Sequence, residues 1–223
     1  MRELGLIFEP EVWGIVGLSF RLSLYAVAAA SALAVPLGLT IAGREFRGKD
    51  RLITLINTLL SLPTVAIGLF VYMALSRNGP LGGLGLLYSP PAVVIGQTIL
   101  ALPIITALTQ AAVAGVDPRV RQTALTLGAG RWQADWAVLG EARGGILAAL
   151  AAGFGRVFGE VGCVVMLGGN IRGYTRTITT TIALETSMGN FARSAVLAVI
   201  LMATALAANA LVHHALRRPG GRP

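Results

Sequence analysis

Five long apolar stretches constrain this chain more than any other feature of its sequence. Each is long enough to cross the hydrocarbon core of a bilayer, which takes about 20 apolar residues of helix. Short polar segments join them, and little of the 223-residue chain is left for a separate soluble domain. We therefore predict a single membrane domain over residues 1–223, with spanning helices at residues 16–42, 52–75, 92–114, 145–167 and 194–216.

The composition agrees with a place in the membrane. Hydrophobic residues make up 55% of the chain and charged residues 13%, a balance that few soluble domains have. The formal charge of +8 could indicate nucleic-acid binding, but the basic residues lie mainly in loops and lack aromatic interleaving. We expect a lipid bilayer and no nucleic acid as partner. A single cysteine, Cys163, excludes a disulfide framework and a metal site of cysteine spacing.

The basic residues are distributed unevenly over the two sides of the predicted spans. One side carries Arg44, Arg47, Lys49, Arg51, Arg119, Arg121, Arg131, Arg143, Arg217, Arg218 and Arg222. The other side carries Arg2, Arg77, Arg172, Arg176 and Arg193. Because Lys and Arg accumulate on the cytoplasmic side, we expect the N-terminus outside and the C-terminus in the cytoplasm of a multi-pass protein of the cell (inner) membrane.

The N-terminal residues are acidic and carry no basic leader. Residues 1–11 contain Glu3, Glu9 and Glu11, so we expect no cleaved signal peptide and a first helix that is retained. Residues 4–15 are apolar but interrupted at Glu9-Pro10-Glu11, which predicts a short interfacial segment and not a sixth span.

The connection between the third and fourth predicted spans, residues 117–140, is half apolar yet charged. Asp117 followed by Pro118 is typical of a helix start, with an acceptor at the N-cap before a proline at the first position. A helix of two to three turns would end at Gly128 and lie flat against the membrane. Its expected apolar stripe consists of Val120, Ala124 and Leu127.

Two interpretations of this helix stay open from periodicity alone. It could rest on lipid headgroups as an ordinary amphipathic loop, with Trp132 and Trp136 as interface anchors. Alternatively, the small residues Ala124 and Gly128 leave a shallow surface that the groove of a partner protein could fit.

The segment Gln122-Thr-Ala-Leu-Thr-Leu-Gly128 resembles the cytoplasmic loop motif of ABC importer permeases, which is usually Glu-Ala-Ala, three residues and a glycine. Gln122 stands where the family usually has Glu, and the later Leu-Pro pair is replaced around Leu139-Gly140-Glu141. The resemblance implies a coupling helix that seats in a cleft of a separate ATPase subunit. It assigns ATPase coupling to Gln122, Thr123, Ala124, Leu127, Gly128, Arg131 and Trp132.

The resemblance extends beyond this loop, over residues 19–216. Residues 61–68, 78–82 and 154–162 are similar to the second and fourth spans of molybdate, sulfate and tungstate permeases, with the tungstate branch nearest. The implied fold is an all-α integral membrane protein of about five transmembrane helices, the type I (MetI-like) permease fold.

The implied function is oxyanion import, with tungstate first and molybdate or sulfate next. The resemblance also implies an active homodimer, an ABC ATPase subunit and a periplasmic or extracellular solute-binding protein. ATP and Mg would bind the ATPase, so this chain is expected to be a transport subunit without a cofactor and not an enzyme.

Residues 43–50 resemble a phosphate-binding loop, but the sequence argues against one. Asp50 replaces the Ser or Thr that would ligate magnesium, and a membrane helix precedes these residues in place of a strand.

Charged residues within the fourth predicted span are candidates for the translocation path. Arg156 and Glu160 are four residues apart, so they share a helix face and can neutralise each other. They either line a path or gate, together with Gly159, or form a structural ion pair. The Gly155-xxx-Gly159 spacing is typical of close helix packing, within the chain or at a subunit seam.

Other sequence features bear on the shape of the bundle. Pro36, Pro63 and Pro103 each interrupt the hydrogen-bond ladder of a predicted span and favour kinks. The threonine-rich run at residues 175–181 is too polar to span, and we expect it to pack over the mouth of the bundle.

Two other classes of protein were weighed against this interpretation. An ion channel or secondary transporter would show more ionisable residues at mid-membrane and often an internal repeat. A membrane-embedded enzyme would need a catalytic or metal cluster, which the two histidines and scattered acids do not form.

Overall fold

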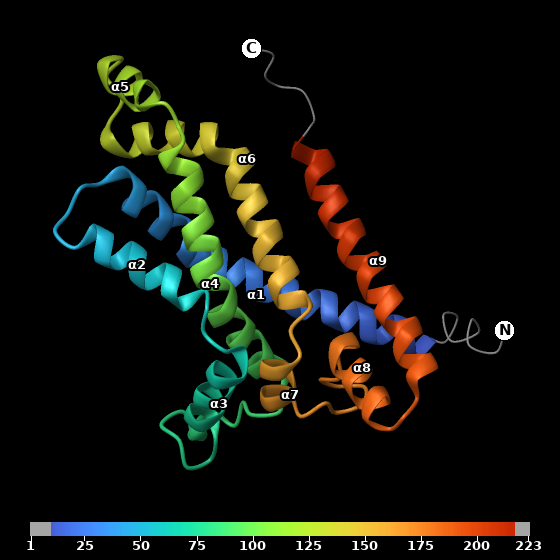
Figure 1. Cartoon of the computed structure of the whole chain (residues 1–223). Helices are drawn as coiled ribbons and strands as arrows, with labels where there is room; N and C mark the ends of the chain where they lie inside the picture. The colour runs from blue at the N-terminus through green and yellow to red at the C-terminus, as the bar shows by residue number, and fades with distance from the viewer. Residues whose placement is uncertain (1–9, 217–223) are drawn as a thin grey trace.

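The computed structural model describes residues 10–216, and every regular element in that range is helical (Figure 1). Arg2, Arg217, Arg218 and Arg222 lie outside the described residues. The elements in chain order are α1 (Pro10–Gly43), α2 (Lys49–Leu59), α3 (Thr64–Leu75), the short 3₁₀ helix η2 (Gly82–Leu84), α4 (Pro90–Ala114), α5 (Pro118–Thr126), α6 (Arg131–Phe158), α7 (Gly162–Gly168), α8 (Ile178–Ser187) and α9 (Phe191–Leu216).

Four helices of the described chain, α1, α4, α6 and α9, are individually long and apolar enough to cross a membrane. The predicted second span is divided into α2 and α3, whose axes meet at 95°. The prediction of five spans is therefore confirmed only where this bent pair counts as one.

The bend between α2 and α3 lies at Pro63. This residue has the extended backbone of an N-cap, with φ −61° and ψ 122°, and a proline disfavours helical geometry in the residue before it. The chain therefore leaves one helix and starts another within a few residues. Pro36 and Pro103, by contrast, stay inside α1 and α4.

The first span begins earlier than the sequence indicated. α1 starts at Pro10, where a proline needs no amide donor, and continues without interruption to Gly43. The prediction of a separate interfacial segment is wrong for residues 10–15, and residues 4–9 lie outside the described part of the chain.

The fourth span also differs from its predicted bounds. α6 begins at Arg131, within the expected loop, and ends at Phe158. A break at residues 159–161 separates it from α7, so the apolar stretch at 145–167 is not one helix. Figure 1 shows α6 running beside α5 at first and then turning toward α7.

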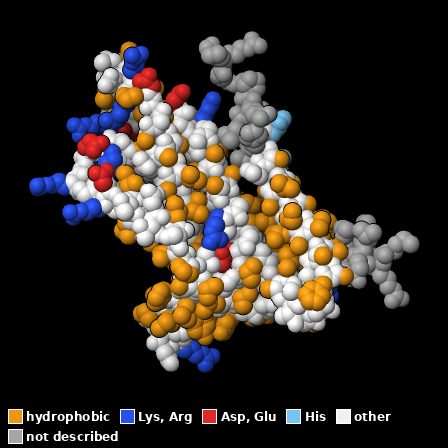
Figure 2. Space-filling view, viewed as in Figure 1, with side chains coloured by type: hydrophobic (Ala, Val, Ile, Leu, Met, Phe, Trp, Pro, Cys, Tyr) orange, Lys and Arg blue, Asp and Glu red, His pale blue; other side chains and the backbone are white. Residues whose placement is uncertain are grey.

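α4 lies at the centre of the bundle, where it packs against α1, α6 and α7. Small side chains allow the close approach of α1, since Ala26, Ala30 and Ala34 are fully buried. Figure 2 shows apolar side chains over much of the visible face, while Lys and Arg gather mainly at the end that carries α5 and the connection from α1 to α2. This distribution matches a bilayer belt with one basic end.

Candidate functional site

The short helix α5 has well-formed ends at the positions that the sequence predicted. The Asp117 side chain accepts a hydrogen bond from the Arg119 amide at 2.8 Å, which caps the first turn. At the other end Gly128 has φ +86°, a conformation that favours glycine. The Ala129 amide donates to the Ala124 carbonyl at 3.0 Å, which completes a glycine-terminated cap.

Two kinds of contact fix α5 to the start of α6. The Arg121 guanidinium donates through Nε and Nη2 to Asp135 Oδ1, at 3.2 and 3.0 Å. Val120 packs on a small apolar cluster that includes Val113 and Val138. The sequence did not predict this ion pair, whose only signal was opposite charges on either side of the short connection between the two helices. An ion pair and an apolar contact therefore link α5 to the first part of α6.

The predicted apolar stripe of α5 is wrong at its last member. Val120 and Ala124 are half-buried, whereas the Leu127 side chain is 82% exposed. α5 ends at Thr126, and Leu127 adopts a C-cap conformation with φ −79° and ψ 7°, so its side chain leaves the helical register. An apolar side chain consequently projects from the loop.

The residues assigned to coupling form a surface that no other part of the described chain covers. Gln122, Thr123, Gly128 and Arg131 are exposed beside Leu127, and only Ala124 is half-buried. Trp132 is 70% exposed and packs edge-to-face on Trp136, with ring centroids 5.8 Å apart. Leu125, which the sequence analysis did not single out, is exposed as well. Exposed aromatic and aliphatic side chains in one patch are typical of a protein or membrane contact.

The second group of predicted residues lies at the break between α6 and α7. Arg156 Nη1 donates to Glu160 Oε2 at 2.9 Å, so the predicted ion pair is present. Glu160 is buried but lies beyond the end of α6, so the two residues do not share one continuous helix. Its other carboxylate oxygen, Oε1, accepts from the Cys163 amide at 3.2 Å, and its carbonyl accepts from Thr179 Oγ1 at 2.9 Å.

The glycines around this break do not all have the packing role that their spacing suggested. A Cβ on Gly153 would lie 2.7 Å from Ile105 Cγ1, and one on Gly162 would lie 2.7 Å from Val65 Cγ2. Close packing thus requires these two. A Cβ on Gly155 would have no described atom within 4 Å, and Gly159 ends α6. The Gly155–Gly159 pair therefore makes no close helix contact within the described chain.

The threonine-rich run is buried against the break and α1. Thr177 caps α8, and Ser19 Oγ of α1 accepts from the Ile178 amide at 2.9 Å. Thr180 Oγ1 donates to Asn170 Oδ1 at 2.9 Å. These hydrogen bonds satisfy polar groups that would otherwise be costly inside an apolar bundle, and they connect the run to both neighbouring segments.

An ion pair connects the loop between α7 and α8 to the start of α1. Arg172 donates through Nε to Glu11 Oε1 at 2.8 Å and through Nη2 to Oε2. This hydrogen bonding raises the pKa of Arg172 above its ordinary value. The pair is largely exposed, so it is an orienting contact and not a main source of stability.

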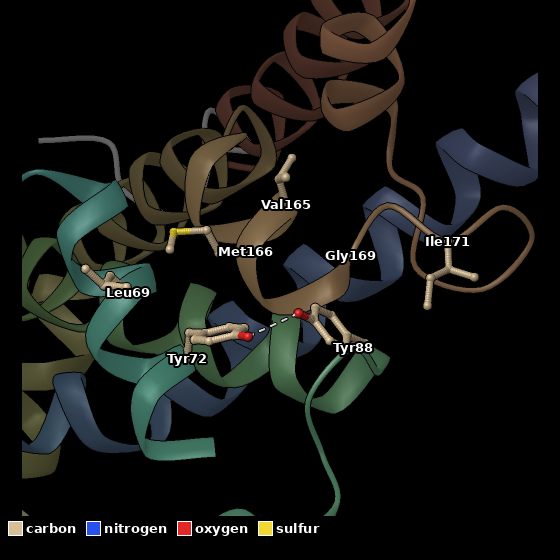
Figure 3. Close-up of a pocket in the computed structure, with 7 residues that line it drawn as sticks. All are labelled: Leu69, Tyr72, Tyr88, Val165, Met166, Gly169 and Ile171. Carbon is tan, nitrogen blue, oxygen red and sulfur yellow. Dashed lines mark hydrogen bonds between the residues drawn. The ribbon is translucent and has the colours of Figure 1, made fainter. Parts of the chain in front are cut away.

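A cavity of about 560 Å³ opens between α3 and α7 (Figure 3). Tyr88 donates its hydroxyl to that of Tyr72 at 3.3 Å, and this hydrogen bond raises the pKa of Tyr88. The rest of the lining is apolar or glycine: Leu69, Val165, Met166, Gly169 and Ile171. With two phenols as its polar side chains, this cavity offers an anion little beyond two weak donors.

The comparison with family models decides the class of this chain. The model of the binding-protein-dependent transport system inner membrane component matches residues 34–219. The chain belongs to this family. It is also 39% identical to the "Probable anion ABC transporter permease protein" of Haloferax volcanii, over 100% of this chain and 98% of that protein. The "Tungstate uptake system permease protein TupB" of Peptoclostridium acidaminophilum is 36% identical over 95% of this chain and 92% of its own length.

Solved structures of ABC transporters share the fold. A chain of the MetNI methionine ABC transporter aligns with a TM-score of 0.74 at 14% identity and covers 94% of this chain and 97% of its own. A chain of a bacterial ABC transporter that imports the polysaccharide alginate aligns with a TM-score of 0.78 at 18% identity, over 99% of this chain and 84% of that one. The fold is therefore the all-α, MetI-like importer permease fold, as the resemblance implied.

Proposed function

We propose that this chain is the permease subunit of an ATP-driven importer of an oxyanion, with tungstate first and molybdate or sulfate next. The likeness to an anion permease and a tungstate permease over nearly the whole chain supports the substrate class. The observation that carries the coupling role is the exposed α5 surface, from which Leu127 and Trp132 project with nothing of the described chain to cover them.

In this proposal α5 docks in a cleft of a separate ABC ATPase. Gln122, Thr123, Ala124, Leu127, Gly128, Arg131 and Trp132 form the contact, and ATP with Mg binds the partner and not this chain. Movement of the ATPase is transmitted to α6 because Arg121 and Asp135 hold α5 on its first turns. The transmembrane part of α6 ends at the Arg156–Glu160 pair, so α6 connects the docking surface to the break.

The remaining parts of the importer follow from the same proposal. Two copies of the chain form a homodimer with the path at their seam, where Arg156, Gly159 and Glu160 line the path or gate. The basic end with α5 faces the cytoplasm, so the C-terminus lies inside and the N-terminus outside. A solute-binding protein delivers the anion to the outer face.

Uptake into proteoliposomes tests the proposal. The chain is reconstituted with its ABC ATPase and its solute-binding protein, and uptake of labelled tungstate, molybdate and sulfate is followed. We expect uptake that requires ATP and favours tungstate. Anion flux without ATP or without the ATPase would instead indicate a channel or secondary transporter and contradict the proposal.

A further inference from the structure

We propose that the guanidinium of Arg156 contacts the oxyanion during its passage, and that Glu160 positions this guanidinium and limits how tightly it binds. The inference rests on the proposed function, because it concerns the anion that the permease would carry. The proposed function places Arg156 in the translocation path or gate. The further step is a direct contact between Arg156 and a tetrahedral anion.

One edge of the Arg156 guanidinium is engaged and the other is available. Nη1 donates to Glu160 Oε2 at 2.9 Å, and within residues 10–216 no other group accepts a hydrogen bond from this side chain. The side chain is 39% exposed. An arginine has five N–H donors in a planar fork, so Nε and Nη2 can still make two parallel hydrogen bonds to an oxyanion.

The helix face around Arg156 is open to an approaching anion. Gly155 precedes it, and a Cβ there would meet no atom of another described helix within 4 Å. Gly159 follows near the same face, and the nearest atom to a Cβ there would be the Gly155 carbonyl oxygen at 3.8 Å. Because residues three apart lie near each other on a helix surface, the missing side chain at Gly159 leaves space near Arg156 that a larger residue would fill.

Glu160 is held in place independently of Arg156. Its side chain is 5% exposed, Oε1 accepts from the Cys163 amide, and its carbonyl accepts from Thr179. The carboxylate therefore stays beside the guanidinium when an anion arrives and reduces the net attraction. A transported ion must bind well enough to enter and weakly enough to leave, and a half-neutralised arginine meets both conditions.

Other candidate sites for the anion are less suitable. The cavity between α3 and α7 is lined by two phenols and apolar residues, without a cationic side chain. Arg21 lies inside the spanning helix α1, where it is exposed, and no carboxylate of the described residues forms an ion pair with it. Arg21 therefore provides a matched control for a general effect of positive charge in the membrane.

Four variants test this inference in the reconstituted importer: Arg156→Gln, Arg156→Lys, the double variant Arg156→Gln with Glu160→Gln, and Arg21→Gln. Anion uptake and the ATPase activity stimulated by the loaded binding protein are measured on the same vesicles. We expect Arg156→Gln and the double variant to reduce uptake per ATP about tenfold, the effect of one lost charge-assisted contact. Arg156→Lys should keep more uptake than Arg156→Gln, and Arg21→Gln should stay close to the unaltered chain.

The double variant separates contact with the anion from a structural ion pair. It removes both charges, so no unpaired charge remains to destabilise the bundle. Recovery of uptake in the double variant would overturn the inference and leave a structural pair. A parallel loss of ATPase stimulation, or an equal loss in Arg21→Gln, would also overturn it. Absence of ATP-dependent anion uptake by the unaltered chain would overturn the proposed function as well, so the two failures are distinguishable.

Discussion

Gly153 and Gly155 lie two residues apart on α6 and face different surroundings. Gly153 packs against Ile105 of α4, and Gly155 faces open space in the described chain. We expect Gly153→Ala to destabilise the purified chain by about 1–3 kcal/mol, because the methyl group would overlap Ile105. Gly155→Ala should keep or slightly raise stability, since alanine favours the helix. Thermal unfolding in one detergent compares them; equal melting temperatures would contradict the described packing.

A substitution at Gly128 gives the most direct test of the proposed docking of α5 to the ATPase. A tryptophan there would strain the backbone at φ +86° by about 1–2 kcal/mol and place a large side chain on the docking surface. We expect Gly128→Trp to insert in the membrane but to lower recovery of the ATPase in pull-downs about tenfold. Gly14→Trp is the control, since Gly14 on α1 also has open space around it. Normal ATPase recovery with Gly128→Trp would refute the coupling assignment.

At the level of elements, the Arg121–Asp135 pair links α5 to the first turns of α6. The pair is partly exposed, so breaking it should cost about 1 kcal/mol or less in stability. Its loss should nevertheless uncouple α5, and we expect Asp135→Asn to lower uptake per ATP. The charge-reversed pair, Arg121→Asp with Asp135→Arg, should recover part of that loss. Uptake per ATP that is unaffected by Asp135→Asn would show that packing of Val120 alone transmits the movement.

How far the sequence predicted these elements depends on the range of the interaction involved. The ends of α5 were predictable because Asp117 and Gly128 act on their own neighbouring backbone. The assignment of ATPase coupling to the α5 surface came from the family resemblance and stays a prediction. The bend at Pro63 was anticipated as a kink, but its 95° angle depends on the packing of α3 against α7. The exposure of Leu127 could not be predicted either, because it follows from the residue at which the helix terminates.

The break between α6 and α7, beside the candidate translocation path, was likewise not predictable from local sequence. A run of apolar residues and glycines at 145–167 is compatible with one straight span, and hydropathy cannot distinguish it from a helix that stops. Distant contacts stabilise the chain at this break: Thr179 Oγ1 donates to the Glu160 carbonyl at 2.9 Å, and the Gln97 side chain donates to the Val157 carbonyl at 3.0 Å. The Arg156–Glu160 pair was found correctly because its spacing is local, even though its helical context was not.

For the whole molecule, the distribution of charge predicts the orientation in the membrane that the proposed function requires. Docking of an ATPase at α5 is possible only if the end rich in Lys and Arg faces the cytoplasm. The chain is suited to a labelling test, since its only cysteine, Cys163, is fully buried in the described structure. Single cysteines at exposed positions can therefore report sidedness against a low background.

We expect a membrane-impermeant thiol reagent, added outside intact cells, to label Asn78→Cys and not Thr123→Cys. Asn78 lies in the turn after α3, at the opposite end of the spans from α5, and both residues are exposed in the monomer. Permeabilised cells should label both, which controls for access, and the unaltered chain should label at neither step. Labelling of Thr123→Cys in intact cells would invert the topology. The α5 surface would then face away from any cytoplasmic ATPase, and the importer mechanism would fail with it.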